Sequence, residues 1–182
     1  MFILITQIIL MIFPVLILVS LFHFLLTGNT PSINTPTSSI KYLSEIIPLD
    51  KDSVFYDLGC GNSKLLRSLS KKFKNTRFIG IDNSLISYIF SKIAVLLGNY
   101  KNIEIKYENF LTSDLSSATH IYLWIYVKDI NLLLEKLKKE LKKSVLIYSL
   151  DFPFEKLSPI EIINLGKEKK FGHTLYVYRL TL

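Results

Sequence analysis

The residues with the clearest chemical meaning are an acid and two glycines that follow a short apolar run. Residues 57–63 read D-L-G-C-G-N-S, and a helix is predicted to begin at Lys64. Glycine at positions 59 and 61 permits a tight turn and lets a ligand approach the backbone without meeting a Cβ. A dinucleotide site requires a further glycine where this sequence has Lys64. The turn Gly59-Cys60-Gly61 therefore predicts a different small-molecule site, in which Asp57 faces a cation and Cys60 is a spacer rather than a nucleophile.

Further polar positions follow the next two predicted strands. Asp82 lies 25 residues after Asp57, and an acid there can accept hydrogen bonds from both hydroxyls of a ribose; we include its neighbour Asn83 in the site. Asn109 can accept a bond from an adenine amino group through its side-chain carbonyl, and Phe110 can pack on the ring. A plain turn at Asn109, and a Rossmann-like domain that binds nothing, are the alternatives. The combination favours a nucleoside cofactor that carries a positive charge.

Short apolar strands alternate with helices from Lys51 onward. The predicted strands are 53–56, 77–81, 103–107, 120–125, 144–149, 160–165 and 173–180, and the predicted helices are 64–73, 85–97 and 130–141. Another helix is expected from the hydroxyl residues 37–39, one of them acting as N-cap, to Ile47. The alternation predicts an α/β fold with a parallel sheet. The last two strands have no helix between them and predict an antiparallel pair at one edge.

The first forty residues differ from the rest of the chain. They contain no Asp, Glu, Lys or Arg, so the whole formal net charge of +7 lies from Lys41 onward. Residues 2–26 form an apolar run, and about 20 such residues suffice to cross a bilayer. A cleaved signal peptide is the alternative, but its apolar core is only about 7–15 residues and follows basic residues that are absent here. We therefore expect residues 1–27 to be a transmembrane anchor, 28–40 a linker and 41–182 the globular domain.

The charged residues, the single cysteine and the histidines bear on where the protein works and which ligands it can bind. The few basic residues near the apolar run lie on its C-terminal side, which favours a cytoplasmic globular domain. The single Cys60 excludes an intrachain disulfide. No group of basic and aromatic residues interleaves as a nucleic-acid groove requires. His23, His120 and His173 are too scattered to predict a metal site.

The pattern D-x-G-x-G-x-S resembles the first motif of class I S-adenosylmethionine (SAM)-dependent methyltransferases, with Ser63 in place of the commoner third glycine. Within that class the chain resembles a family of small protein lysine methyltransferases, which includes the archaeal broad-specificity enzymes and the mitochondrial methyltransferase of the ATP synthase c-subunit. Beside the D-L-G-C-G turn, the segments that carry the resemblance are Asn34–Thr37, Asn109–Leu115, Tyr148–Pro153 and His173–Tyr178.

The resemblance implies a Rossmann-like seven-stranded methyltransferase sheet, mostly parallel with an antiparallel last strand. It also implies that Thr35, Pro36 and Thr37 close over SAM, so that residues 28–40 are both linker and cofactor cap. The sequence departs from the family at Ile33, where an aromatic residue is usual, and at Asn109, where Asp is usual. These departures are compatible with cofactor binding and leave the substrate open.

The acceptor side of the site is expected at the end of the fourth strand. Trp124 and Tyr126 lie there, where an aromatic face or a phenol can hold an amine, and we predict them as catalytic residues; packing roles are the alternative. With the apolar N-terminus, these features predict methylation of a lysine in a protein at or near the membrane. The alternatives are a methyltransferase acting on a lipid or quinone-type molecule, and a membrane protein that binds SAM without chemistry.

Overall fold

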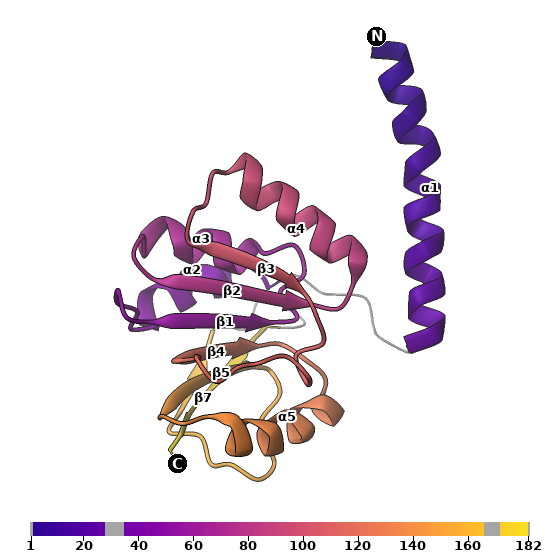
Figure 1. The fold of residues 1–182 in the computed structure, drawn as a ribbon. Helices are drawn as coiled ribbons and strands as arrows, with labels where there is room; N and C mark the ends of the chain where they lie inside the picture. The colour runs from indigo at the N-terminus through magenta and orange to yellow at the C-terminus, as the bar shows by residue number, and fades with distance from the viewer. Residues whose placement is uncertain (1, 28–34, 166–171, 182) are drawn as a thin grey trace.

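Seven strands form one mixed sheet in the computed structural model, which describes residues 2–27, 35–165 and 172–181 (Figure 1). The strand order is β3-β2-β1-β4-β5-β7-β6. The strands are β1 Val54–Leu58, β2 Arg77–Asp82, β3 Ile103–Tyr107, β4 His120–Leu123, β5 Val145–Leu150, β6 Glu161–Asn164 and β7 Thr174–Leu180. Strands β1 to β5 pair in parallel, while β7 runs antiparallel to both β5 and β6. The predicted sheet and its antiparallel ending are confirmed.

The strand order reverses between β1 and β4. β4 is the central strand of the sheet, and β1 lies next to it. From β1 the chain moves outward to β2 and β3, and then returns to place β4 on the other side of β1. In open α/β sheets, ligands bind beyond the carboxyl ends of the strands at such a reversal. The turn that carries Gly59 and Gly61 begins at this position.

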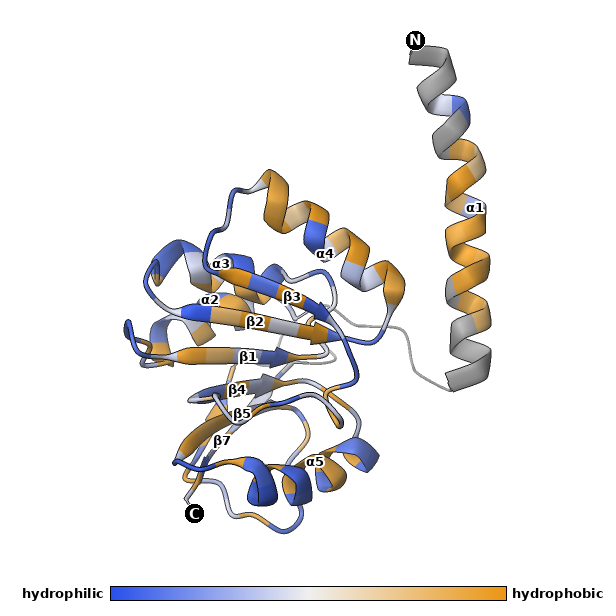
Figure 2. Cartoon of the chain, viewed as in Figure 1, coloured by the Kyte–Doolittle hydropathy of each residue, from blue (hydrophilic) through white to orange (hydrophobic). Residues whose placement is uncertain are grey.

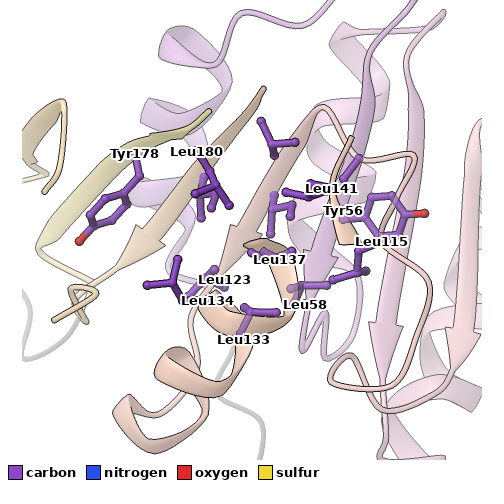
Figure 3. Close-up of a cluster of buried hydrophobic side chains, with 14 of the residues drawn as sticks. Tyr56, Leu58, Leu115, Leu123, Leu133, Leu134, Leu137, Leu141, Tyr178 and Leu180 are labelled. Atoms are coloured by element: carbon purple, nitrogen blue, oxygen red, sulfur yellow. The ribbon is translucent and has the colours of Figure 1, made fainter. Parts of the chain in front are cut away.

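Helices cover both faces of the sheet (Figure 1). The described helices are α1 Phe2–Thr27, α2 Thr37–Ile46, α3 Lys64–Lys72, α4 Leu85–Leu97 and α5 Val127–Glu140. On one face α5 buries Ile130, Leu133 and Leu137 against the strands, and Figure 3 shows Leu133 and Leu137 in this cluster. Their spacing of three to four residues produces the apolar stripe of an amphipathic helix.

The opposite face is covered by α2 and α3. Ile40 and Leu43 of α2 pack with Leu66 and Leu69 of α3 in one buried cluster. Thus α2 begins inside the segment predicted as linker, and it is part of the folded core. Its N-cap is Pro36, with no side-chain capping bond, so the predicted hydroxyl cap is wrong. Pro36 has φ −58° and ψ 144°, and its carbonyl accepts a hydrogen bond from the Ile40 N–H at 3.0 Å.

The N-terminal helix α1 stands beside the globular part in Figure 1. Its apolar side chains from Leu10 to Phe13 are all more than half exposed. Within the described part of the chain, however, no helix is long and apolar enough to cross a bilayer. The predicted transmembrane anchor is therefore not supported. Residues 28–34 of the predicted linker lie outside the described residues.

Candidate active site

The turn after β1 is held against the neighbouring strand by its own backbone. Gly59 and Gly61 have φ values of +78° and +53°, which glycine adopts without the strain that a Cβ introduces. The N–H groups of Gly59 and Cys60 both donate to the Ile81 carbonyl, at 2.8 and 3.1 Å. Ser63 closes the turn with a φ of +57° and precedes α3. These bonds fix the path of the chain at the carboxyl end of β1.

Asp82 binds the same turn through its side chain. One carboxylate oxygen accepts from the Gly61 N–H at 2.8 Å, and the other accepts from the Ser84 N–H at 2.8 Å. Burial raises the pKa of Asp82, and the two backbone hydrogen bonds oppose that rise. The structure thus gives Asp82 a positioning role that the sequence did not predict; its ribose contact stays a prediction, as does the role of the half-buried Asn83.

Asp57 is a buried carboxyl group at the centre of the site. Its register neighbours are Gly80 on β2 and Tyr122 on β4, and it is only 4% exposed. Burial, with a smaller contribution from the charge of Asp82, raises the pKa of Asp57 to about 8. Among the described residues no donor makes a hydrogen bond to this carboxyl group. A buried carboxylate without a partner is costly, so the position suits a cationic ligand group.

A pocket opens beside Asp57. It is lined by Thr35, Asp57, Gly59, Cys60, Asn62, Lys64, Leu65, Tyr122 and Trp124. Five of these were predicted from the sequence: Thr35, Asp57, Gly59, Cys60 and Trp124. Sequence reasoning missed Tyr122, Lys64, Asn62 and Leu65. The period of two along β4 places Tyr122 on the same face as Trp124, so that signal could have found it.

The predicted cap segment is tied to the pocket by side chains. Thr35 Oγ1 lies 3.0 Å from the Tyr122 hydroxyl, and Lys64 Nζ donates to Thr37 Oγ1 at 2.7 Å. Pro36 packs on Gly172, where a Cβ would lie 2.9 Å from its Cγ. Thr35 and Tyr122 are 87 positions apart in the chain. These contacts bring residues 35–37 over the end of β1 and β4.

Gly172 is in turn held by Asp151. The Asp151 carboxylate accepts from the N–H groups of Gly172, His173 and Thr174, at 2.6, 2.8 and 3.2 Å. Asp151 has a φ of +62°, and the Gly172 carbonyl accepts from Ser39 Oγ at 3.2 Å. A chain of contacts therefore connects the end of β5 to the cap segment.

Asn109 and Phe110 do not line the pocket as the structure describes it. The Asn109 side-chain oxygen accepts from the Leu111 N–H at 2.9 Å, which closes a local turn of the kind that Asn favours. Phe110 is half-buried and packs against the core that α5 covers. The plain-turn alternative fits Asn109 in this structure, and the adenine contacts stay predictions.

The two predicted acceptor residues lie apart. Trp124 is half-buried and lines the pocket. Tyr126 is 47% exposed and stacks on Phe152, with ring centroids 6.3 Å apart. Phe152 follows Asp151 at the end of β5, so this aromatic pair lies at the same edge of the sheet as the pocket.

Cys60 is packed beneath the turn. A Cβ added to Gly80 would lie 2.8 Å from Cys60 Sγ, so the missing side chain of Gly80 makes room for the thiol. Burial raises the pKa of Cys60 well above its ordinary value. The thiol stays protonated and is a poor nucleophile, in agreement with a spacer role. Among the described residues, no group of three or more His, Cys, Asp and Glu side chains could hold a metal ion.

The bond between Tyr122 and Thr35 gives a first testable prediction. Burial raises the pKa of the Tyr122 phenol, so the hydroxyl stays neutral and able to donate. Tyr122→Phe removes the bond and should weaken cofactor binding roughly fivefold, because a neutral hydrogen bond contributes about 1 kcal/mol. Isothermal titration calorimetry with SAM measures this change. Thr35→Val should have the same effect and add nothing to Tyr122→Phe; additive losses would show that the two side chains act separately.

Comparison with known proteins identifies similar domains. Residues 57–161 match the family described as the ANTKMT methyltransferase domain. A protein-lysine N-methyltransferase from Saccharolobus islandicus (strain REY15A) is 26% identical over 156 residues, which cover 82% of this chain and 93% of that protein.

Solved structures show the same fold. An RNA methyltransferase from Salinibacter ruber, in complex with S-adenosyl-L-homocysteine, matches with a TM-score of 0.74 at 20% identity and covers 82% of this chain and 94% of its own. A SAM-dependent methyltransferase from Aquifex aeolicus matches with a TM-score of 0.62 at 16% identity, covering 79% and 89%.

Proposed function

This chain belongs to the ANTKMT methyltransferase domain family, and we propose that it transfers methyl groups to lysine side chains of a protein. It is a SAM-dependent methyltransferase. The observation that carries the lysine proposal is the similarity to a protein-lysine N-methyltransferase over 93% of that relative's length.

The described residues fit SAM at the pocket. Asp57 is a buried carboxyl group that lines the pocket without a donor among the described residues, and the α-ammonium group of SAM is a cation of suitable size. Lys64, which begins α3 and also lines the pocket, suits the carboxylate of the same molecule, together with the N–H groups at the start of that helix. We assign Asp57 and Lys64 to the amino-acid end of the cofactor, and residues 35–37 to its cover.

The remaining cofactor assignments rest on position. The carboxyl end of β2 carries Asp82 and Asn83 next to the turn, and each Asp82 oxygen has a lone pair beyond the backbone bond that it accepts. We propose that this edge meets the ribose. Asn109 and Phe110 follow β3 at the same end of the sheet, and we propose that they border the adenine.

The chemistry requires positioning more than acid–base groups. When bound, SAM supplies an electrophilic methyl group on a sulfonium ion. An ammonium cannot attack it, so the protein must favour the neutral amine, and a partly dry, aromatic pocket disfavours the charged form of a lysine. Trp124 on the pocket wall and Tyr126 beside Phe152 supply such surfaces. We propose that they orient the lysine stem while proton loss goes to water.

The place of the reaction is a separate proposal. Residues 1–40 contain no Asp, Glu, Lys or Arg, and most of the described exposed side chains of α1 are apolar. These features support a protein that works at a membrane surface on an acceptor in or near it. Lys41 follows the apolar run while no basic residue precedes it, and this asymmetry supports a catalytic domain on the cytoplasmic side. Cell fractionation followed by protease treatment of intact vesicles tests this location; recovery of the protein in the soluble fraction would contradict it.

A methyl-transfer experiment tests the substrate class. The purified full chain is incubated with methyl-labelled SAM and with separated soluble, membrane-protein and lipid fractions, and labelled proteins are digested for mass spectrometry. We expect label in protein, on lysine, and none with the Asp57→Asn variant. Label in the lipid fraction would replace the lysine proposal by the lipid alternative. An absence of label in all fractions, with SAM binding intact, would contradict transfer to either class.

A further inference from the structure

The outward face of α4 is more apolar than its inward face. Ser87 and Ser91 are the buried residues of this helix, whereas Leu96 and Leu97 are 79% and 81% exposed. A surface helix ordinarily turns its apolar stripe toward the core and its polar residues toward water. We call Phe90, Ile93, Leu96 and Leu97 the α4 apolar face; all four are about half exposed or more.

The buried serines are explained by the site, but the exposed aliphatic residues are not. Ser91 Oγ donates to the Gly61 carbonyl at 2.6 Å, so the inward side of α4 helps to hold the glycine turn. Nothing in that role calls for Leu96 or Leu97 to be apolar. Contiguous exposed apolar side chains of this kind mark surfaces that contact a partner or a membrane.

The N-terminal helix provides a second apolar surface next to the first. α1 contacts α4, and Figure 2 shows hydrophobic residues on both helices. On α1, Leu10, Met11, Phe13 and Phe22 are more than half exposed, and these positions point in several directions around a helix. A protein groove covers one side of a helix, whereas lipid can surround it. The exposed apolar side chains of α1 therefore favour contact with lipid over contact with a protein groove.

The charge of the chain also favours contact with lipid. Residues 1–40 are uncharged, and the net charge of +7 lies on the rest of the chain. Lys92 is exposed on α4 itself, and its Nζ lies 5.9 Å from the centre of the Tyr88 ring. An apolar helix face that carries a lysine, on a domain of net positive charge, is a combination that favours the interface of an anionic bilayer.

We propose that the α4 apolar face, together with α1, docks the catalytic domain on an anionic lipid bilayer. This goes beyond the proposed function because it names the surface of the domain that meets the membrane, whatever the methyl acceptor is. The bond between Ser91 and the Gly61 carbonyl, on the inward side of α4, connects the same helix to the glycine turn.

Vesicle sedimentation of the full chain tests the contribution of α4. The vesicles contain phosphatidylcholine alone or phosphatidylcholine with phosphatidylglycerol. The double substitution Leu96→Gln and Leu97→Gln should lower partition to the anionic vesicles roughly tenfold or more, because two large apolar side chains lose their lipid contact. The matched control is Leu132→Gln on α5, where Leu132 is 59% exposed. α4 packs Tyr88 and Val95 into the cluster of α2 and α3, on the face of the sheet opposite α5, so the control should bind like the wild type. Equal binding of the α4 variant and the control would overturn the proposal.

A site-specific label separates lipid contact from other occupants. Cys60 is buried, so a cysteine introduced by Leu97→Cys reacts selectively with an environment-sensitive fluorophore. Its emission should shift to the blue when anionic vesicles are added, while a label introduced by Leu132→Cys should not respond. A shift that depends on protein concentration without lipid would identify a second copy of the chain as the occupant and overturn the proposal, as would the absence of any shift.

Discussion

Replacement of Asp57 by Asn is expected to lower the affinity for SAM roughly a hundredfold, because loss of one partner from a buried ion pair costs about 3 kcal/mol or more. Asp57 is 4% exposed and lines the pocket. Asn has nearly the same shape, so the change removes the charge and leaves the packing. Calorimetric titration of the full chain with SAM measures the loss.

The protonation of Asp57 also predicts the direction in which SAM affinity changes with pH. The pKa of Asp57 is raised to about 8 without a ligand, so the carboxyl group is largely protonated at neutral pH. A bound cation favours the ionised form, so binding releases a proton and SAM affinity should rise with pH, by up to about tenfold per unit below the raised pKa. The α-amino group of the ligand has an ordinary pKa of about 7.7–8.0 and loses its charge above it. The pH dependence of SAM affinity should therefore be measured below that range. In Asp57→Asn the slope should vanish.

Stability provides the control for this variant. The folded-state pKa of Asp57 lies above its ordinary value of 3.8, so the folded state holds the proton more tightly than the unfolded state. The stability contribution of the protonated group is complete at low pH and is lost as pH rises toward about 8. Asp57→Asn should therefore be at least as stable as the wild type at alkaline pH in thermal unfolding. Unchanged SAM affinity in a stable Asp57→Asn protein would remove Asp57 from the cofactor site.

The sequence predicted best what depends on local pattern. Strand and helix alternation, together with the glycines at 59 and 61, was enough to predict the sheet and to place a tight turn at the carboxyl end of β1. Asn109 shows where such reasoning fails: the residue type fits a nucleoside contact, but the same side chain closes its own turn by a bond to Leu111. Local bonds of this kind compete with a ligand for one acceptor.

Contacts between distant segments were the harder part. Thr35 and Tyr122 are 87 positions apart and Asp151 and Gly172 are 21 apart; no local periodicity encodes either distance. Asp82 was placed correctly at the end of β2, but its bond to Gly61 depends on how the turn folds back on that strand. The apolar N-terminus predicted α1 as a helix. The same apolar pattern also predicted a transmembrane anchor, which the described part of the structure does not support.

Asp151 is expected to be the residue outside the pocket whose loss harms the protein most. Asp151→Ala removes a carboxylate that accepts from the N–H groups of Gly172, His173 and Thr174 and places a Cβ-bearing residue without a local hydrogen bond at a φ of +62°. The two effects together should lower the free energy of unfolding by about 2–4 kcal/mol. Urea denaturation measures this loss. SAM affinity should fall as well, because Gly172 packs on Pro36 of the cap segment.

Two further substitutions at Asp151 separate the causes. Asp151→Gly keeps the left-handed backbone without strain, so any destabilisation that remains comes from the lost hydrogen bonds. Asp151→Asn can keep one oxygen toward His173 and Thr174, which share Oδ1, while its amide group cannot accept from the Gly172 N–H on the other side. This variant should retain most of the stability and still bind SAM more weakly, with little change in kcat at saturating cofactor. If Asp151→Asn binds SAM as tightly as the wild type, Gly172 does not position the cap, and Asp151 serves the fold alone.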